Sequence, residues 1–285
     1  MSDLCSLDGT ILPLAEARIS PLDRGFLFGD GVYEMMKILG GEAVLWPAHR
    51  QRLADGLAVA RLTPSGGVEA LERACAELLA SSGVGEGSLY LEVTRGAGRR
   101  EKIPLPDLPA TVFAWASAHP HPAPAGLPQV LVSQQDIRWG RCDVKAVSLM
   151  ATVLGKLAAG DAGADEVLFV GPGGEVREGG STSFFVLRDG VLVTHPLGHR
   201  ILPGVTRKAL LAVAGELGLA VDETPPRLAE RTTWDEAMIA STLLGVQPVT
   251  ALDGAPIGQR EPGPWTRRLA SAVADHERRH TSAFV

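Results

Sequence analysis

The chain has 285 residues, of which 45% are hydrophobic and 21% are charged, so it is long enough for one large domain or two modest ones. A formal net charge of −6 excludes a broad basic face of the kind that binds nucleic acid or an anionic membrane. Three scattered cysteines, Cys5, Cys75 and Cys142, have no metal-ligand spacing and predict a reducing compartment. The sequence begins without a basic-then-apolar leader and contains no apolar run of about 20 residues, which predicts a soluble cytoplasmic protein.

The first part of the chain predicts hairpins and helices in turn. Leu4 to Leu14 is expected to form a small hairpin that turns at Asp8-Gly9. Tyr33 to Leu39 and Ala43 to Trp46 predict a second hairpin around Gly40-Gly41. Two helices and two further strands are then expected, at Pro47 to about Ala60, Val68 to Ser81, Ser88 to Thr94 and Ala110 to Ala116.

A proline-rich segment, His119 to Pro128, divides the chain. Its four prolines fix φ and remove backbone donors, so it cannot be a helix or a central strand. We therefore expect one domain over residues 1–118, a linker over 119–128 and a second, larger domain over 129–285. The second domain is expected to contain a helix from about Val205 to Leu217 and a terminal helix over residues 262–281.

The stretch from Asp136 to Phe185 carries the strongest chemical signal. Lys145 follows a β-like run and precedes a helical pattern whose buried face is expected to consist of Val147, Met150, Leu154 and Leu157. Glu178 follows in the glycine-rich sequence EGGSTS. Pyridoxal phosphate (PLP) needs such a pair, because a lysine forms its Schiff base and a carboxylate keeps its ring nitrogen protonated. A lone lysine is more often a solvated surface residue, so this interpretation depends on the residues around it.

Two further segments could hold a phosphate and a carboxylate. The segment from Leu202 to Arg207 opens a helix, where backbone N–H groups and the helix dipole favour anions, although an ordinary helix start capped by Thr206 is the simpler interpretation. The residues expected to complete a monophosphate cup are Ser241, Thr242 and Arg52. Arg100 and Lys102 could hold a substrate carboxylate, and a solvated basic loop explains them equally well.

One motif points to a different class of enzyme. The sequence His276-Glu277-Arg278-Arg279-His280 matches H-E-x-x-H, a helical pattern in which two histidines bind zinc. It ends five residues before Val285 (285 − 280), which leaves no room for a downstream ligand. Its polar surroundings favour a solvated terminal helix, and we predict no metal site.

As an ordered set, these segments resemble the fold-type IV PLP enzymes, which include branched-chain aminotransferases, D-amino-acid transaminases and aminodeoxychorismate lyases. The matching segments are DRGFLFGDGVYE, HRQRL, VTRGAGRR, DIRWGRCDVKAVSL, GADEVLFV, EGGSTSFF, ILPGVTR and STLLGVQPVTALDG, within Leu4 to Gly254. The resemblance implies an α+β fold with a small α/β domain and a larger β-barrel-like domain with helices. It also implies a homodimer in which the partner subunit completes the active site.

The resemblance assigns a role to each matching position. Lys145 corresponds to the Schiff-base lysine, Glu178 to the partner of the ring nitrogen, and Leu202 to the apolar residue behind the ring. Tyr33 corresponds to an active-site tyrosine. The phosphate cup is expected from Arg52, Val205, Thr206 and Thr242, with Ser241 beside it.

The segments DIRWGRCDVKAVSL and EGGSTS are most similar to those of D-amino-acid transaminases. Arg100 matches the arginine of that group, but Lys102 stands where a histidine is usual and Ser183 where an asparagine is usual, so the carboxylate-binding residues differ. We expect a PLP-dependent transaminase that moves an amino group from a D-amino acid to a 2-oxo acid. The alternatives are a branched-chain L-amino-acid aminotransferase, an (R)-amine transaminase, an aminodeoxychorismate lyase, a zinc hydrolase at His276 and His280, and a cofactor-binding protein without turnover.

Overall fold

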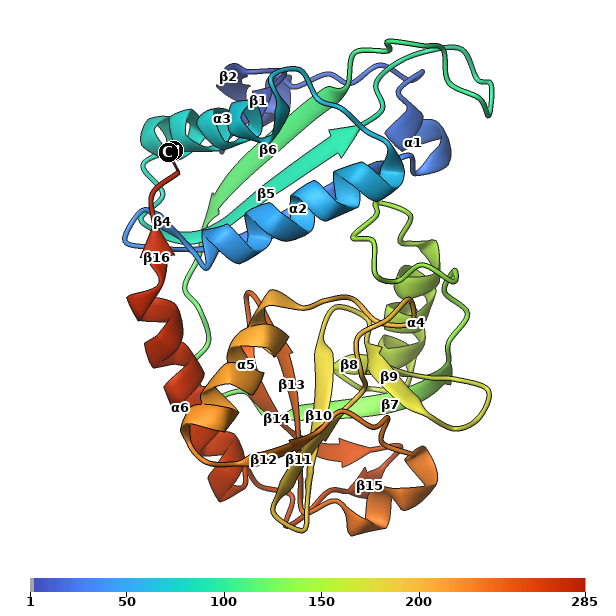
Figure 1. Ribbon diagram of the computed structural model, residues 1–285, viewed down its shortest axis with the longest axis vertical. Coiled ribbons are helices and arrows are strands. Elements are labelled where there is room, and N and C mark those ends of the chain that lie inside the picture. Colours follow the sequence, from blue (N-terminus) through green and yellow to red (C-terminus); the bar gives the residue numbers. More distant parts are fainter. Residues whose placement is uncertain (1–2, 285) are drawn as a thin grey trace. The chain divides into compact units, whose positions relative to one another are not determined.

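The computed structural model describes residues 3–284 and divides into two compact units (Figure 1). Among these residues, the first unit contains 3–121, 144–149 and 280–284, and the second contains 122–143 and 150–279. The sequence predicted two continuous domains, whereas both units are discontinuous. Residues 144–149 and 280–284 pack with the first unit although they were expected in the second domain.

The first unit is built on a seven-stranded sheet with the strand order β16-β4-β3-β5-β6-β1-β2. Its strands are β1 (Leu4–Leu7), β2 (Thr10–Pro13), β3 (Gly31–Leu39), β4 (Glu42–Val44), β5 (Glu86–Thr94), β6 (Thr111–Ala118) and β16 (Thr281–Ser282). Its helices are η1 (Leu14–Glu16), α1 (Arg24–Phe28), α2 (Trp46–Ala60) and α3 (Gly67–Ser82). Both predicted hairpins are confirmed, because β1 pairs with β2 and β3 pairs with β4 in antiparallel register.

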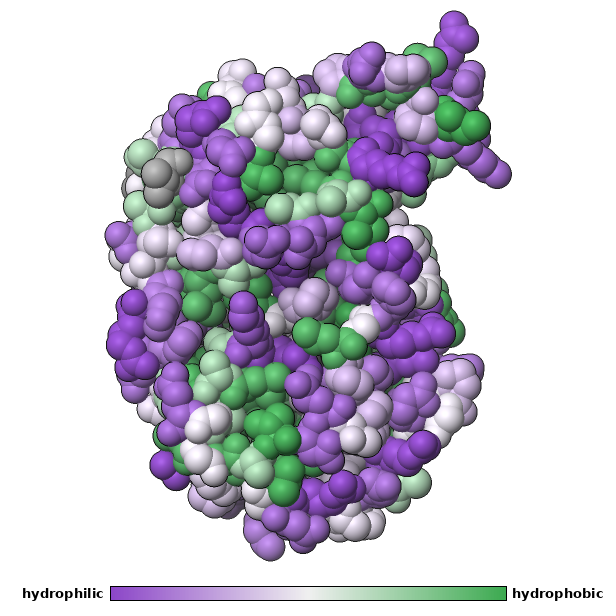
Figure 2. Space-filling model, viewed as in Figure 1, coloured by the Kyte–Doolittle hydropathy of each residue, from purple (hydrophilic) through white to green (hydrophobic). Residues whose placement is uncertain are grey.

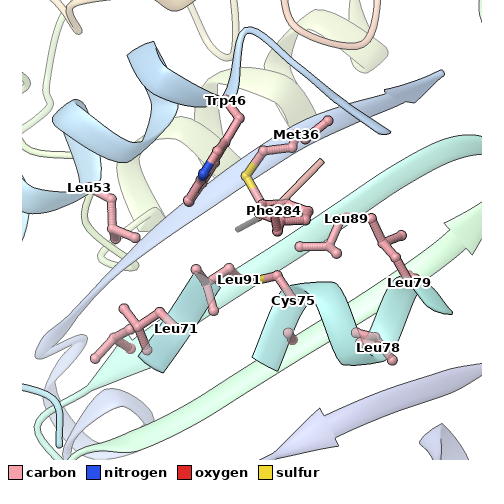
Figure 3. Packing of buried hydrophobic residues seen from close by; sticks show 14 of the residues in the cluster. Met36, Trp46, Leu53, Leu71, Cys75, Leu78, Leu79, Leu89, Leu91 and Phe284 are labelled. Carbon is pink, nitrogen blue, oxygen red and sulfur yellow. The ribbon is translucent and has the colours of Figure 1, made fainter. Parts of the chain in front are cut away.

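The core of the first unit lies between the sheet and the helices α2 and α3 (Figure 3). Met36 and Leu89 come from neighbouring strands, and Leu53 and Leu78 come from the two helices. Phe284, from the far end of the chain, completes this cluster, and its ring centroid lies 4.7 Å from that of Trp46. Burial of these side chains is the main stabilising contribution to the unit.

The predicted return strand over Ala43 to Trp46 is too long by two residues. Strand β4 ends at Val44, and Leu45 adopts a left-handed conformation with φ of 54°. Helix α2 then begins at Trp46, and Pro47 occupies its first turn, as predicted. The Trp46 side chain is buried in the core of this unit.

The second unit is built on a nine-stranded sheet with the order β12-β11-β10-β13-β14-β7-β8-β9, in which β15 pairs with β14. Its strands are β7 (Gln129–Gln135), β8 (Glu166–Val170), β9 (Val176–Gly179), β10 (Ser183–Arg188), β11 (Val191–Thr194), β12 (Ala220–Asp222), β13 (Glu236–Ser241), β14 (Gly245–Leu252) and β15 (Ala255–Pro256). Strand β9 also pairs with β10, so the path from β10 through β13, β14, β7, β8 and β9 closes on itself. This closure confirms the predicted α+β fold with a barrel-like domain.

The helices of the second unit are α4 (Met150–Asp161), α5 (Val205–Glu216), η2 (Leu228–Thr233) and α6 (Pro264–Arg279). Helices α5 and α6 cover one buried cluster that includes Phe185, Leu210 and Leu269. A second buried cluster, around Leu168, Phe184 and Ile239, lies among the strands. The predicted helices near residues 205–217 and 262–281 are therefore confirmed.

Helix α4 presents its large apolar side chains to the surface, which contradicts the predicted buried face. Met150, Leu154 and Leu157 are 71%, 48% and 60% exposed. The helix instead packs through small residues, Gly155 and Ala159, which are buried against strand β8. The 3.6-residue period identified an apolar stripe correctly, but the face of the helix that contacts the sheet is the one with the small side chains.

A matched pair of glycines in α4 tests this packing. A Cβ atom at Gly155 would lie 2.8 Å from Cζ of Phe169 and 3.1 Å from Cγ1 of Val167, whereas one at Gly160 would meet no atom within 4 Å. We expect Gly155→Ala to lower the free energy of unfolding by about 1–3 kcal/mol, because the buried ring must move. Gly160→Ala is expected to raise it by up to about 1 kcal/mol through helix propensity. Urea unfolding of both variants measures the difference, and equal effects would contradict this account.

Polar and apolar residues are interspersed over the face seen in Figure 2, in both units. Exposed large apolar residues include Phe26, Ile103 and Trp139. Within residues 3–284, no helix combines the length and the apolar character needed to cross a bilayer.

Candidate active site

The predicted site residues are divided between the two units. The first unit carries Tyr33, Arg52, Arg100, Lys102 and Lys145. The second unit carries Glu178, Leu202, Val205, Thr206, Ser241 and Thr242.

Lys145 is held against the first residues of strand β3 by backbone pairing. The Lys145 carbonyl accepts a hydrogen bond of 3.0 Å from the Tyr33 N–H, and Ala146 forms an antiparallel bridge with Val32. The Lys145 Nζ lies 4.0 Å from the centroid of the Tyr33 ring. Ammonium over an aromatic face is a favourable contact. The lysine therefore has both its backbone and its amine fixed relative to the sheet.

A second tyrosine and a carboxyl group continue this cluster across the sheet. The ring centroids of Tyr33 and Tyr90 are 5.5 Å apart, and the Tyr90 hydroxyl donates a hydrogen bond of 2.6 Å to Glu92. Burial raises the pKa of Glu92, although the hydrogen bond from Tyr90 opposes the shift. Sequence reasoning missed both residues, yet they follow Ser88 in alternation and so share one face of β5.

Arg52 lies on α2 and is paired with a fully buried carboxylate on β3. Its Nε and Nη2 donate to the two oxygens of Glu34 at 2.7 and 2.8 Å, and His49 Nδ1 lies 2.8 Å from the same group. Burial raises the pKa of Glu34, but Arg52 and then His49 outweigh it and lower this pKa to about 2. Glu34 is therefore ionised and fixes the Arg52 guanidinium. The phosphate role of Arg52 stays a prediction.

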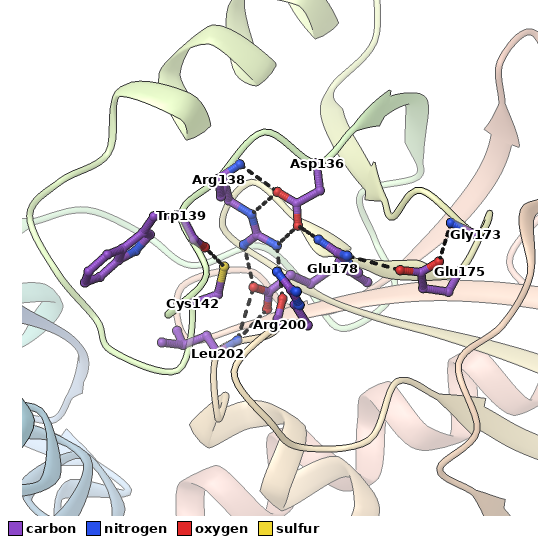
Figure 4. Close-up of polar contacts among 10 residues, drawn as sticks. Asp136, Arg138, Trp139, Cys142, Gly173, Glu175, Glu178, Arg200 and Leu202 are labelled. Atoms are coloured by element: carbon purple, nitrogen blue, oxygen red, sulfur yellow. Dashed lines mark hydrogen bonds and ion pairs between the residues drawn. The ribbon is translucent and has the colours of Figure 1, made fainter.

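Glu178 is the penultimate residue of strand β9 and is the centre of a polar network in the second unit (Figure 4). Arg138 Nη1 donates to one of its oxygens at 2.6 Å, and the Leu202 N–H donates to both oxygens at 3.1 and 3.0 Å. Arg138 is held in turn by Asp136 through bonds of 3.0 and 2.9 Å. These contacts fix the orientation of the Glu178 carboxyl group.

The environment of Glu178 sets its protonation. Burial raises its pKa, Arg138 opposes the shift, and the resulting pKa is about 7, above the ordinary value of 4.5. A nearby cation, such as a protonated ring nitrogen, would favour the ionised form. The sequence analysis did not identify Arg138 as a partner of Glu178. The only local signal for it is that Asp136 directly follows strand β7 and Arg138 comes two residues later.

The start of helix α5 has the features of a phosphate site. Gly204 is the N-cap residue, so the alternative in which Thr206 caps the helix is wrong. A Cβ atom at Gly204 would lie 2.7 Å from Oγ of Ser183, so only glycine allows this close approach. Val205 and Thr206 are the first two helical residues, whose N–H groups have no acceptor within the helix.

Hydroxyl groups in the same unit add donors of the kind that a phosphate binds. The Thr182 Oγ1 is buried without a hydrogen-bond partner among the described residues. Ser241 ends strand β13, and Thr242 follows it in the turn before β14. Buried hydroxyl groups normally have a partner, so the Thr182 hydroxyl is free to donate to a bound group. Together with the carboxyl of Glu178, these residues fit the phosphate and the ring nitrogen of PLP.

The H-E-x-x-H sequence gains no support as a metal site. Glu277 is buried in α6, and His280 follows the last residue of that helix. Across residues 3–284, no three side chains of His, Cys, Asp or Glu are grouped so that they could hold a metal ion.

Comparisons with known proteins agree with this geometry. The family model of class IV amino-transferases matches residues 31–252. A D-alanine aminotransferase from Staphylococcus aureus (strain N315) is 31% identical over 279 residues, which cover 96% of this chain and 98% of the relative. A D-alanine aminotransferase from Bacillus licheniformis is 33% identical over 267 residues, covering 93% and 94% of the two chains.

Solved structures show the same fold. The T.th. branched-chain amino acid aminotransferase with pyridoxamine 5'-phosphate superposes with a TM-score of 0.91 at 24% identity, covering 100% of this chain and 99% of that one. The branched-chain aminotransferase of Thermoproteus uzoniensis with norvaline superposes with a TM-score of 0.85 at 22% identity, covering all of both chains.

Proposed function

The chain belongs to the class IV aminotransferases and is a PLP-dependent enzyme, and on that premise we propose that it moves the amino group of a D-amino acid to a 2-oxo acid. The relatives at 31–33% identity that support the D-amino acid are D-alanine aminotransferases. The branched-chain enzymes are less than 25% identical, so their likeness supports the fold alone.

The observation that carries this proposal is the fixed amine of Lys145. Its Nζ is held over the Tyr33 ring by a segment that pairs with β3 through two backbone contacts. A general base must sit within reach of the proton that it removes, so a fixed amine suits this role better than a mobile surface lysine.

Each polar group then has a definite task. When PLP is bound, it supplies an electron sink for the charge that develops as the substrate loses its α-proton. Lys145 would hold the cofactor covalently through Nζ until the substrate amine displaces it, and the amine freed in that exchange would then take the α-proton and return it as general base and acid. Glu178 holds a proton at the ring nitrogen, and Arg138 and the Leu202 N–H keep its carboxylate aimed. Leu202 would pack behind the ring, the position that the resemblance implies for it.

The phosphate group is assigned to the start of α5. The backbone N–H groups of Val205 and Thr206 and the helix dipole favour an anion there. The hydroxyls of Ser241, Thr242 and Thr182 and the guanidinium of Arg52 are the further donors. The substrate carboxylate is assigned to Tyr33, Arg100 and Lys102, of which the two cationic residues lie in an exposed loop.

Two further proposals concern the oligomeric state and the cellular location of the protein. We propose a homodimer, which is supported by the outward-facing apolar side chains of α4 at Met150, Leu154 and Leu157. A molar mass measured by light scattering tests it.

We propose a cytoplasmic location, which is supported by three buried, unpaired cysteines within the described residues.

The test of the proposed function is an absorbance spectrum of the purified protein, recorded before and after D-alanine and then L-leucine are added. A visible cofactor band that bleaches with D-alanine supports the assignment. Bleaching with L-leucine alone would move the enzyme to the branched-chain group, and no band after PLP is supplied would overturn the role of Lys145. An (R)-arylamine and aminodeoxychorismate, tested as further substrates, separate the remaining alternatives within the family.

A further inference from the structure

We propose that Arg24 is a positioning residue, which holds the loop of Arg100 and Lys102 in the conformation that binds a substrate carboxylate. The carboxylate role of that loop rests on the proposed function, whereas the anchoring of the loop by Arg24 rests on geometry alone.

Arg24 lies at the start of α1 and is only 3% exposed, although the loop that it contacts is exposed. Its Nη1 donates to the Glu101 carbonyl at 2.5 Å, and its Nη2 donates to the Lys102 carbonyl at 3.2 Å. Hydrogen bonds from an ionised donor are about twice as strong as neutral ones. The buried guanidinium of Arg24 therefore binds the backbone carbonyls of the two residues that directly follow Arg100.

The guanidinium of Arg24 is itself held from the other side. Its Nε donates to Asp30 at 2.9 Å, and Asp30 also accepts bonds of 2.8 and 2.9 Å from Arg95. Burial raises the pKa of Asp30, but the bonds from Arg95 and Arg24 outweigh it and lower this pKa. Asp30 is thus ionised and fixes Arg24. Arginine has no acceptor and carries donors in a rigid fork, so its remaining N–H groups point toward the loop.

The ring of Phe28 links Arg24 directly to Arg100. The guanidinium carbon of Arg24 lies 4.8 Å from the ring centroid, and that of Arg100 lies 5.6 Å from the same centroid. The helix that carries Phe28 is fixed to the sheet, because the Arg24 N–H donates to Gly96 and the Asp23 carboxylate bonds Thr94 and Thr111. Loop, ring and guanidinium therefore form one assembly that sets the direction of Arg100.

The alternative is that Arg24 only stabilises the first unit. Arg95 provides a matched control, because it shares Asp30 with Arg24 but contacts the carbonyls of Ala60 and Arg61 rather than the loop. A purely structural role predicts similar behaviour for Arg24→Met and Arg95→Met. A positioning role predicts an effect at residues 99–102 for Arg24→Met alone.

Limited proteolysis by trypsin measures the anchoring without cofactor or activity. Trypsin cleaves after arginine and lysine, so mass mapping of early cuts after Arg99, Arg100 and Lys102 reports opening of this loop. We expect Arg24→Met to speed these cuts by about 10-fold or more, since each lost charge-assisted bond favours the open loop. Arg24→Lys is expected to lie between Arg24→Met and the unmodified protein, and Arg95→Met to leave the cuts within about twofold.

Kinetics of the PLP-loaded enzyme then test the carboxylate. We expect Arg24→Met to raise KM for D-alanine by about 10-fold and to change kcat little. This pattern is typical when the lost interaction binds the substrate and the transition state equally well. Arg100→Met should also raise KM for D-alanine by about 10-fold. The double variant should raise KM little further, because both substitutions remove the same interaction with the carboxylate. Ethylamine, which lacks the carboxylate, should show no change in kcat/KM.

The outcomes separate the two proposals. Unchanged cuts in Arg24→Met, or equally faster cuts in Arg95→Met, would overturn the anchoring. Faster cuts with an unchanged KM for D-alanine would overturn the positioning of the carboxylate. Absence of D-alanine turnover in the unmodified enzyme would reject the proposed function instead, and the proteolysis would still decide whether Arg24 anchors the loop.

Discussion

Replacing Lys145 with arginine or alanine is expected to lower steady turnover by about 10⁴-fold or more, the upper range for loss of a positioned proton-transfer group. Arginine keeps the positive charge over Tyr33 but stays protonated in proteins, so it cannot take a proton or bind PLP covalently. Initial rates with D-alanine and a 2-oxo acid measure the loss.

A second lysine serves as the control for Lys145. Lys156 lies on α4 and pairs with Glu166 at 3.2 Å, a contact that arginine can keep. Lys156→Arg should retain normal turnover. Borohydride reduction with PLP, followed by peptide mapping, should label only the peptide that contains Lys145. A label elsewhere, or normal turnover by Lys145→Arg, would remove Lys145 from the mechanism.

Replacing Glu178 with alanine or glutamine is expected to leave PLP bound but to slow turnover by about 10²- to 10³-fold. The reason is that the ring nitrogen loses the carboxylate that stabilises its proton, and removal of one such electrostatic contact to the transition state typically costs about 2.7–4 kcal/mol, which corresponds to this range of rates. Titration with PLP and initial rates separate the two effects. An unchanged rate in both variants would contradict the assigned role.

The same carboxyl group gives a pH signature in the protein without PLP. Its pKa of about 7 is raised above the ordinary 4.5, so the folded state binds a proton that the unfolded state has lost between these values. The free energy of unfolding contributed by Glu178 is therefore fully present below pH 4.5 and is lost as pH rises through about 7. Glu178→Gln should remove this dependence, which urea unfolding at pH 5 and pH 8 measures. Identical pH dependence in both proteins would refute the raised pKa.

Local signals in the sequence were enough for most individual elements. Asp8-Gly9 and Gly40-Gly41 specify tight turns, and Pro47 specifies a first helical turn, because each acts through its own backbone. The helix α4 shows where such signals stop. Periodicity reveals that one stripe is apolar, but whether Leu154 or Gly155 faces the sheet depends on how closely β8 approaches.

The site follows the same division. Lys145 and Glu178 were identified from their residue types and their neighbours in the chain. Arg138 and Glu34 were not, because each acts on a residue that is distant in sequence, 40 positions away for Arg138 and Glu178 and 18 for Glu34 and Arg52. The assignment of residues 144–149 to the first unit was missed for the same reason: pairing with β3 leaves no mark in the local sequence.

The position of Phe284 has a consequence for how the protein is made. Residues 1–121 emerge from the ribosome first. The core that they form lacks the side chain that packs against Trp46 until strand β16 and Phe284 have been synthesised. Residues 122–279 must be translated in between, which takes roughly 8–32 s at ordinary elongation rates. During that interval the nascent chain exposes apolar surface of the kind that chaperones bind. The unit that leaves the ribosome first is therefore the last to be completed.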